Sequence, residues 1–297
     1  MNFGVALGRL HPGFFVDVTL EAELLGYESV WLPEHLVLTQ QMSRSPHPGE
    51  THPPVPPETP VFDAFAYLAY LAGRTERIRL GTHVYNIGLR HPFTTARGVQ
   101  TVDLLSGGRL EFGIGASWLE EEWIATQLDF QTRGRRVDEA VEVCKQLWSE
   151  AIAEYHGEFF SFEHVVFEPK CFQHPWPPIL IGGESAAALK RAARSGDGWI
   201  GIHHTFESAL GPIERLHALL SHYGRDREGF QIVLGGEVSS RDDIARWEEL
   251  GVTRLIVAPW RRSRDAIEGL RQFASDLMST CSKITDDDGK GPERAAS

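Results

Sequence analysis

The chain has 297 residues, of which 42% are hydrophobic and 24% charged, and these proportions are typical of a globular protein with one large domain or two modest ones. Its net charge of −12 argues against nucleic-acid binding as the main function, although a local basic pocket for an acidic cofactor is compatible with it. No apolar run reaches the roughly 18 residues of a membrane span, and the N-terminal residues lack a secretion-signal pattern, so we expect no membrane segment.

Cysteine usage indicates a reducing compartment. Cys144, Cys171 and Cys281 are odd in number and scattered, and they form no Cys-x-x-Cys pair. We therefore interpret them as packing residues and expect a cytoplasmic protein.

Apolar runs alternate with helical patterns along the chain. The predicted strands span residues 3–7, 29–32, 78–84, 110–114, 179–181, 199–202, 231–234 and 255–258. The predicted helices span residues 16–25, 62–71, 91–105, 136–148, 186–195, 207–222, 242–250 and 264–278. Eight alternations in a chain of this length favour an α/β fold of the (β/α)8 TIM-barrel type over an open sheet, and the active sites of such barrels lie beyond the carboxyl ends of the strands.

Two insertions interrupt this alternation. Residues 39–60, after the second strand, contain seven prolines and cannot form a helix, so they predict a long loop over the barrel mouth. Residues 155–178, after the fourth helix, alternate apolar and polar side chains and predict a short hairpin. Residues 282–297 have little apolar content and are expected to be a disordered tail, which leaves residues 1–281 as a single barrel domain.

Glu34 and His35 end the second strand, in the sequence SVWLPEH. Histidine titrates near neutral pH, so at the barrel mouth it can transfer a proton. A histidine that only caps or stabilises the loop is the alternative, and position at the strand end does not decide between them.

Glycines accompany the ends of two further strands. Gly81-Thr82-His83-Val84 ends the third strand, where either a distorted backbone beside a flat ligand or an ordinary strand end fits the spacing. The turn Gly113-Ile114-Gly115-Ala116-Ser117-Trp118 begins like a dinucleotide fingerprint but has Trp118 in place of its last glycine. A Rossmann-type site is therefore not supported.

Gly182-Gly183-Glu184-Ser185 follows the fifth strand and precedes a helix. Two glycines there can leave backbone N–H groups free at a helix N-terminus, where a phosphate binds well, and Ser185 can cap the helix or contact the phosphate. A tight turn with no ligand is the equally weighted alternative.

The remaining polar clusters predict less. His203 and His204 end the sixth strand, and His47 and His52 lie in the Pro-rich loop, but no metal-binding spacing occurs, so we expect no metal and interpret His203 or His204 as pocket lining. Arg133, Arg135 and Arg136 begin the fourth helix and are interpreted as part of a solvated face.

Several segments together resemble the bacterial luciferase-like monooxygenase superfamily, in particular its branch that uses the deazaflavin coenzyme F420. They are LGYESVWLPEH, ERIRLGTHV, LRHPFTTARGVQTVDLLSGGRLEFGIGASWLEEEW, RGRRVDEAVEVCKQLW, HGEFFSF and PPILIGGESAAALKRAARSGDGW, and they extend over nearly the whole predicted barrel.

The resemblance implies a cofactor across the carboxyl ends of the strands, with its tricyclic ring against a non-proline cis peptide at His83–Val84. It implies that Glu34 and His35 lie beside the reactive face of the ring. It also implies that the cofactor phosphate is held by Gly182, Gly183, Glu184 and Ser185, and that Ser117 and Trp118 line the cofactor site.

The chain departs from the family pattern at two places, and the first of them limits the substrate. In the branch that oxidises glucose 6-phosphate, a glutamate follows the glycine turn, but here Trp118 stands at that position and Ser117 replaces the last glycine, so this substrate is not expected. His83 stands where a small residue is usual and brings a polar group towards the cofactor.

The anionic cofactor tail also requires local basic residues in an acidic protein, and the candidates are Lys190, Arg191, Arg135 and Arg136.

The hypothesis is an F420-dependent oxidoreductase that transfers a hydride between the deazaflavin and a small organic substrate, with His35 moving the proton. The alternatives are a monooxygenase that uses reduced FMN and oxygen, and a non-catalytic flavin-binding or deazaflavin-binding protein. The expected partners are a small-molecule substrate, a flavin or F420 reductase that supplies the cofactor, and a second copy in a homodimer.

Overall fold

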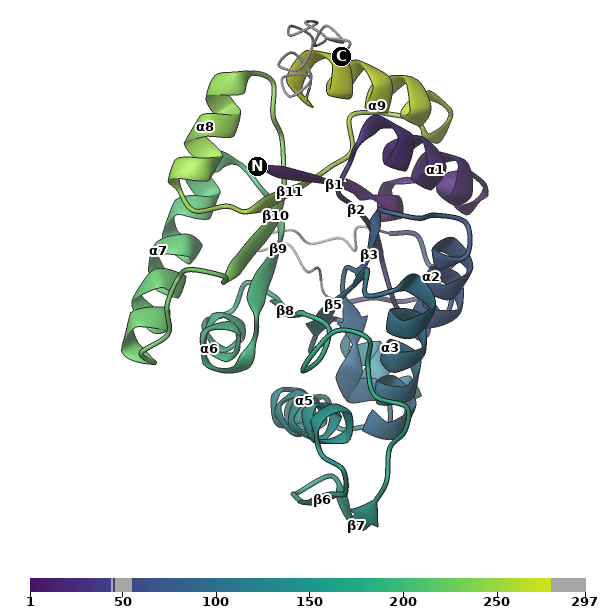
Figure 1. Ribbon diagram of the computed structural model, residues 1–297, viewed down its shortest axis with the longest axis vertical. Helices are drawn as coiled ribbons and strands as arrows, with labels where there is room; N and C mark the ends of the chain where they lie inside the picture. Colours follow the sequence, from purple (N-terminus) through teal and green to yellow (C-terminus); the bar gives the residue numbers. More distant parts are fainter. Residues whose placement is uncertain (44, 46–54, 279–297) are drawn as a thin grey trace, which may run out of the picture.

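The computed structural model describes residues 1–43, 45 and 55–278, whose central strands form a closed parallel barrel surrounded by helices (Figure 1). Neighbouring strands follow the order β3-β2-β1-β11-β10-β9-β8-β5-β4, and pairing of β3 with β5 closes the ring. The strands are β1 Asn2–Ala6, β2 Ser29–Leu32, β3 Arg79–Thr82, β4 Tyr85–Asn86, β5 Leu110–Gly115, β8 Ile179–Gly182, β9 Gly198–His204, β10 Gln231–Gly236 and β11 Arg254–Val257. The predicted TIM barrel is confirmed.

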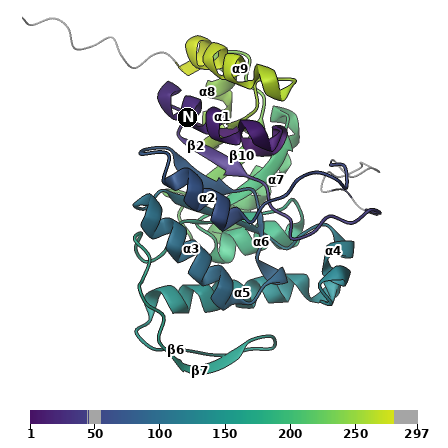
Figure 2. The same cartoon turned by 90° about the vertical axis from the view of Figure 1, so that its right-hand side faces the viewer.

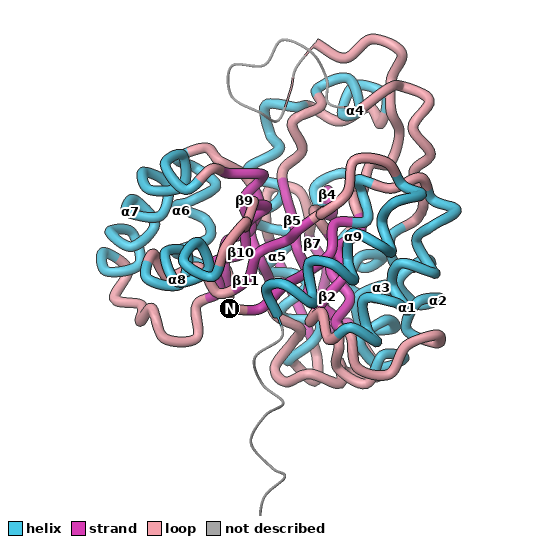
Figure 3. The backbone as a smooth tube through the Cα atoms, turned by 90° about the horizontal axis from the view of Figure 1, so that it is seen from above, coloured by secondary structure: helices cyan, strands magenta, loops and turns pink. Residues whose placement is uncertain are grey.

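The helices pack around the outside of the barrel, as Figures 2 and 3 show from two further directions. Several begin at a side-chain cap, since Asp63 accepts a hydrogen bond from the N–H of Ala66 and Ser240 forms a capping box with Asp243. The helices are α1 Phe15–Leu25, α2 Ala64–Ala72, α3 Pro92–Ser106, α4 Glu120–Ala125, α5 Arg133–Ser149, α6 Ala186–Ser195, α7 Phe206–His222, α8 Arg241–Glu249 and α9 Ala266–Phe273.

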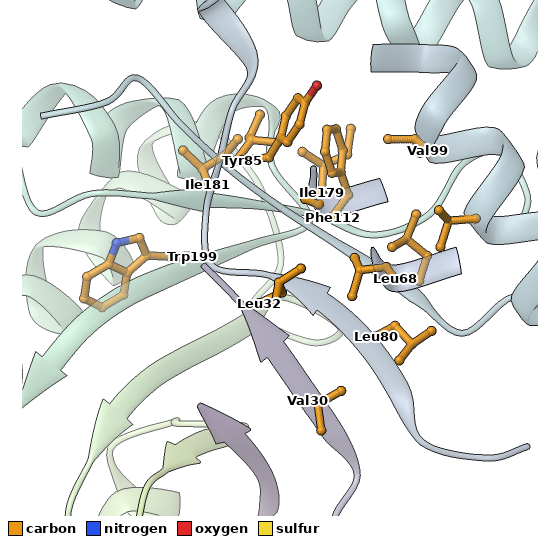
Figure 4. Close-up of a cluster of buried hydrophobic side chains, with 14 of the residues drawn as sticks. Val30, Leu32, Leu68, Leu80, Tyr85, Val99, Phe112, Ile179, Ile181 and Trp199 are labelled. Carbon is orange, nitrogen blue, oxygen red and sulfur yellow. The ribbon is translucent and has the colours of Figure 1, made fainter. Parts of the chain in front are cut away.

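Alternation along the strands divides the apolar side chains between two buried regions. One set packs between the strands and the helices, and Figure 4 shows part of it, including Val30, Leu80 and Phe112. A smaller set forms a separate cluster inside the barrel: Trp31, Leu180, Ile200, Val233 and Ile256. Because successive side chains of a strand point to opposite faces, Leu180 faces inwards while Ile179 and Ile181 face the helices.

Charged side chains fill the barrel at the amino ends of its strands. Glu111 and Arg254 are almost fully buried there, with one Glu111 oxygen 2.5 Å from Nε of Arg79 and 3.3 Å from a terminal nitrogen of Arg254. Arg254 also binds Glu28 at 2.6 Å. These opposite charges compensate one another, which is what allows them to be buried. The network occupies the amino end of the barrel interior.

Both insertions lie where the sequence predicts them, after β2 and after α5. The second contains the antiparallel hairpin of β6 Ala153–His156 and β7 Ser161–Val165. The middle of the Pro-rich loop, with His47 and His52, lies outside the described residues, and so does the predicted tail at 282–297.

Three details of the structure differ from the predictions. The predicted third strand is broken, because β3 ends at Thr82 and the chain resumes as β4 at Tyr85. α5 begins at Arg133, three residues earlier than the apolar stripe indicates. The short helix α4 was not predicted at all, since its six residues are too few to display a helical period.

Within the described residues, no helix combines the length and the apolar character that crossing a lipid bilayer requires.

Candidate active site

A cavity of about 1100 Å³ opens at the carboxyl ends of the strands, and residues within or directly after every barrel strand line it. All the site residues predicted from the sequence lie in its lining: Glu34, His35, His83, Val84, Ser117, Trp118, Gly182, Gly183, Glu184 and Ser185. The prediction therefore brings together residues that are up to 151 positions apart (185 − 34). That these residues contact a cofactor stays a prediction.

Val84 lies on the inner surface of the cavity, directly after the cis peptide bond that joins it to His83. The cis bond expected from the resemblance is thus present. Glycines on the neighbouring strands leave space for this part of the chain. A Cβ atom on Gly113 would lie 2.0 Å from the carbonyl oxygen of Thr82, and one on Gly182 would lie 2.8 Å from Cγ1 of Val84. A side chain on Gly113 would displace the backbone at the end of β3, and one on Gly182 would press on the side chain of Val84.

His83 directs its ring across the barrel. Burial lowers its pKa to about 4, and a hydrogen bond to the backbone of Gly201 on β9 acts in the opposite direction. Its ring lies edge-on to Trp31, with 6.4 Å between the ring centroids. His83 is therefore neutral at physiological pH, and the polar group that it brings to the cavity carries no charge.

Glu34 is almost fully buried, and protein groups occupy both of its carboxylate oxygens. One binds Arg90 at 2.5 Å, and the other accepts a hydrogen bond from the N–H of Asn86 at 2.8 Å. Burial raises the pKa of Glu34, while Arg90 and the Asn86 N–H act against that rise. Glu34 thus joins the end of β2 to β4 and to the segment that follows it.

His35 lies at the edge of the cavity and contacts a carboxylate that the sequence did not single out. Its Nδ1 is 3.2 Å from Oε2 of Glu122, and its ring is nearly perpendicular to that of Trp118, with centroids 5.6 Å apart. Glu122 lies on α4 and is fully buried. No local signal in the sequence separates Glu122 from Glu120 and Glu121, because all three lie between Leu119 and Trp123.

The diglycine turn after β8 leads directly into the N-terminus of α6. Gly183 has φ of +114°, which favours glycine, and Ser185 caps α6 by accepting a hydrogen bond from the N–H of Ala188 at 3.1 Å. The first turn of α6 therefore begins at the cavity, where its N–H groups can receive a phosphate.

The side chain of Glu184 binds within the protein. Its carboxylate accepts a hydrogen bond from the N–H of Ile202 at 2.9 Å and lies 3.2 Å from Nε2 of His204. The side chain therefore holds β9 against the turn, and only its backbone is suited to an anion. His204 is buried in this contact, whereas His203 lines the cavity.

Two arginines lie in the cavity lining beside the start of α6. Arg191 was among the predicted candidates, and it also forms a two-point ion pair with Asp138 at 2.8 and 3.2 Å. Arg133 was interpreted as part of a solvated face. The structure places it, half-buried, in the lining of the cavity, where it stacks on Phe130 with 3.9 Å to the ring centroid.

The other basic candidates lie away from this cavity. Arg135 is exposed and pairs with Glu158, and Arg136 donates to the carbonyl of Gly88. Lys190 is exposed on α6 and is absent from the cavity lining. No three His, Cys, Asp or Glu residues among those described are grouped so that they could hold a metal ion.

Comparison with known proteins decides the family. Residues 4–288 match the family model described as luciferase-like monooxygenase. The chain belongs to this family. Its members are oxidoreductases or monooxygenases, so this luciferase-like protein is an enzyme of that kind, and the resemblance stated from the sequence is confirmed.

Relatives of the luciferase-like protein use more than one cofactor. An uncharacterized protein of Mycobacterium tuberculosis is 30% identical over 93% of this chain and 99% of its own length. The F420-dependent glucose-6-phosphate dehydrogenase of Kineococcus radiotolerans is 30% identical over 67% of this chain and 55% of its own. The oxygenase component of the flavin-dependent trigonelline monooxygenase of Acinetobacter baylyi is 27% identical, over 75% of this chain and 56% of its own.

A solved structure shows the same fold. The coenzyme F420-dependent tetrahydromethanopterin reductase of Methanopyrus kandleri aligns with a TM-score of 0.75 over 93% of this chain and 98% of its own, at 15% sequence identity.

Proposed function

We propose that the protein is an F420-dependent oxidoreductase that transfers a hydride between the deazaflavin and a small organic substrate. The observation that carries this proposal is the arrangement within one cavity. Val84 offers an apolar surface for a flat ring, His35 stands at one edge, and the start of α6 with Arg133 and Arg191 stands at another.

The cavity fits such a cofactor in size and in chemistry. Its volume of about 1100 Å³ is slightly above the range of roughly 300–1,000 Å³ that is usual for ligand pockets, which suits a large cofactor together with a small substrate. The N–H groups of the α6 first turn suit a phosphate, and the two arginines suit the further negative charge of the cofactor tail. Arg133 and Arg191 offset the overall charge of −12 only locally. Local compensation is sufficient because charge interactions are screened beyond about 10 Å.

When bound, the deazaflavin supplies the carbon centre that accepts or donates the hydride. The protein supplies the accompanying proton transfer at His35, and Trp118 excludes water from one side of that ring. Trp118 also replaces the carboxylate expected for a glucose 6-phosphate enzyme, so the proposed substrate is a different small molecule.

A flavin monooxygenase is the second candidate, because a flavin-dependent protein is among the relatives and the phosphate site suits FMN as well. Titration of the purified protein with oxidised F420, followed by fluorescence, separates the two. We expect a Kd below about 50 μM, equivalent to about −6 kcal/mol, and weaker competition by FMN. Tighter FMN binding with oxygen-dependent turnover would favour the monooxygenase, and the absence of F420 binding would end the proposal.

Two arginines on one helix provide a matched control. Arg133→Gln removes a cation that lines the cavity, whereas Arg135→Gln removes one that is exposed and paired with Glu158. We expect Arg133→Gln to weaken F420 binding by about 5- to 10-fold, the effect of one charge-assisted contact, and Arg135→Gln to leave it unchanged. Equal effects of the two variants would place the cofactor tail elsewhere.

A further inference from the structure

The carboxylate of Glu122 contacts two parts of the chain, residues 35–37 and Ser117. Its Oε1 accepts from the N–H of Leu36 at 2.6 Å and from the N–H of Val37 at 3.3 Å. Its Oε2 lies 3.2 Å from Nδ1 of His35 and accepts from the hydroxyl of Ser117 at 3.1 Å. The side chain is fully buried, so water does not compete for these contacts.

The short helix that carries Glu122 lies beside the loop that follows β2, and Figures 2 and 3 agree on this placement. A second contact joins the same two segments, because the N–H of Ser43 donates to Glu121 at 2.9 Å. The position of His35 is therefore set by α4 as well as by the strand that precedes it.

The chemistry of the contact fixes the tautomer of His35. A carboxylate oxygen can only accept, so the ring nitrogen that faces Glu122 must carry a hydrogen. In a neutral ring this hydrogen occupies Nδ1 and leaves the lone pair on Nε2. The perpendicular ring of Trp118 restricts rotation of the imidazole, so Nε2 is left as the ring atom available to the cavity that His35 lines.

We propose that Glu122 is a positioning residue that holds His35 as the Nδ1–H tautomer and so presents Nε2 as the proton-accepting atom. The role of Nε2 as proton acceptor in the reaction rests on the proposed function. The tautomer itself does not, because it is a property of the protein without any cofactor.

Glu122→Gln changes the tautomer without removing the side chain. The amide oxygen has to face Leu36 and Val37, since the amide nitrogen cannot accept from two backbone N–H groups. The NH2 group then faces His35 and donates to Nδ1. The hydrogen of the neutral ring moves to Nε2, and the atom that faced the cavity as an acceptor becomes a donor.

The test is a two-bond proton–nitrogen NMR spectrum of the cofactor-free protein with 15N-labelled histidine, recorded at about pH 8. The spectrum of His35→Gln assigns the His35 signals. We expect the Nδ1–H tautomer in the wild-type protein and the Nε2–H tautomer in Glu122→Gln. Glu121→Gln is the matched control, because Glu121 lies on the same helix and binds the same loop without contacting His35 in the structure, and it should keep the wild-type tautomer.

An Nε2–H tautomer in the wild-type protein would overturn the proposal by itself, even if a variant failed to fold. An unchanged tautomer in folded Glu122→Gln would overturn it too, since Glu122 would then only anchor the loop. Once a substrate is identified, Glu122→Gln should lower kcat by about 100-fold or more with KM within about threefold. If F420 fails to bind but the tautomers follow this pattern, the proposed function fails and the positioning role stands.

Discussion

Replacing Arg90 by methionine tests whether the buried ion pair behind His35 holds the carboxyl ends of β2 and β4 together. Arg90 binds Glu34 at 2.5 Å and also stacks over Tyr85, with 4.5 Å to the ring centroid. Methionine keeps an unbranched apolar side chain but leaves Glu34 without a cation. Since Glu34 is only 4% exposed, its charge cannot be rehydrated without opening the structure.

The magnitude follows from this burial. Removing one partner of a buried pair costs about 3–5 kcal/mol, most of it the cost of an uncompensated charge. Loss of the stacking on Tyr85 adds about 0.5–2 kcal/mol. Glu34→Gln in the Arg90→Met background should restore about 2–3 kcal/mol, because it removes the stranded charge and keeps an acceptor for the N–H of Asn86.

The destabilisation should also depend on pH. Burial raises the pKa of Glu34 in the folded protein, and loss of Arg90 raises it further. A raised carboxyl pKa favours folding at low pH, and this advantage is lost as pH rises through the folded-state value. Arg90→Met should therefore be less destabilising at about pH 5 than at about pH 7.5. At the higher pH, Glu34 must either stay charged without a cation or take up a proton at a cost in free energy.

Thermal unfolding measured by intrinsic fluorescence is a sufficient assay. At about 2 °C per kcal/mol for a chain of this size, Arg90→Met should lower the midpoint by about 7–14 °C at pH 7.5. A decrease below about 2 °C, or no recovery in the double variant, would show that Glu34 is not held as a buried charge.

The neighbouring residues give two further predictions. Burial lowers the pKa of His83 to about 4, so its contribution to stability is lost as pH falls from about 6.5 to 4. The stability advantage of the wild-type protein over His83→Gln should therefore shrink by about 2 kcal/mol between pH 7.5 and pH 5. Urea unfolding that gives the same difference at both pH values would refute this prediction. Gly182→Ala places Cβ 2.8 Å from Cγ1 of Val84, so it should cost about 1–3 kcal/mol and weaken F420 binding, and unchanged stability and affinity would show that Val84 moves aside freely.

The fold could be predicted because its signals are local and repeated. The alternating runs around Leu110 and Ile179 and the helical stripe after His91 each report burial on one side, and eight such pairs leave few arrangements other than a barrel. The break between β3 and β4 could not be predicted from periodicity, because it depends on space left by Gly113 and Gly182 on two other strands. Only the resemblance pointed to it.

The site residues likewise divide into those with a local signal in the sequence and those that depend on contacts between distant segments. His35 and the Gly182 turn were found because they lie at strand ends, a position that the predicted barrel assigns to the mouth. Glu122 was missed because its significance lies in a contact with His35, 87 residues earlier, and no local pattern encodes that contact. The place of Arg133 in the cavity lining was not predicted for a related reason, since it depends on how α5 packs beside α6.

His35 and His83, two of the histidines that line the cavity, show how environment divides acid–base roles between identical side chains. His83 is placed against Trp31 and the backbone of Gly201, and burial keeps it neutral, so it can shape the cavity without taking up a proton. His35 instead contacts the buried carboxylate of Glu122, which can hydrogen-bond both the neutral and the charged ring. A group that exchanges protons must be stabilised in both of its states, and of these two histidines His35 is the one that contacts a carboxylate. The chemistry of this cavity therefore depends on α4 as much as on the barrel strands.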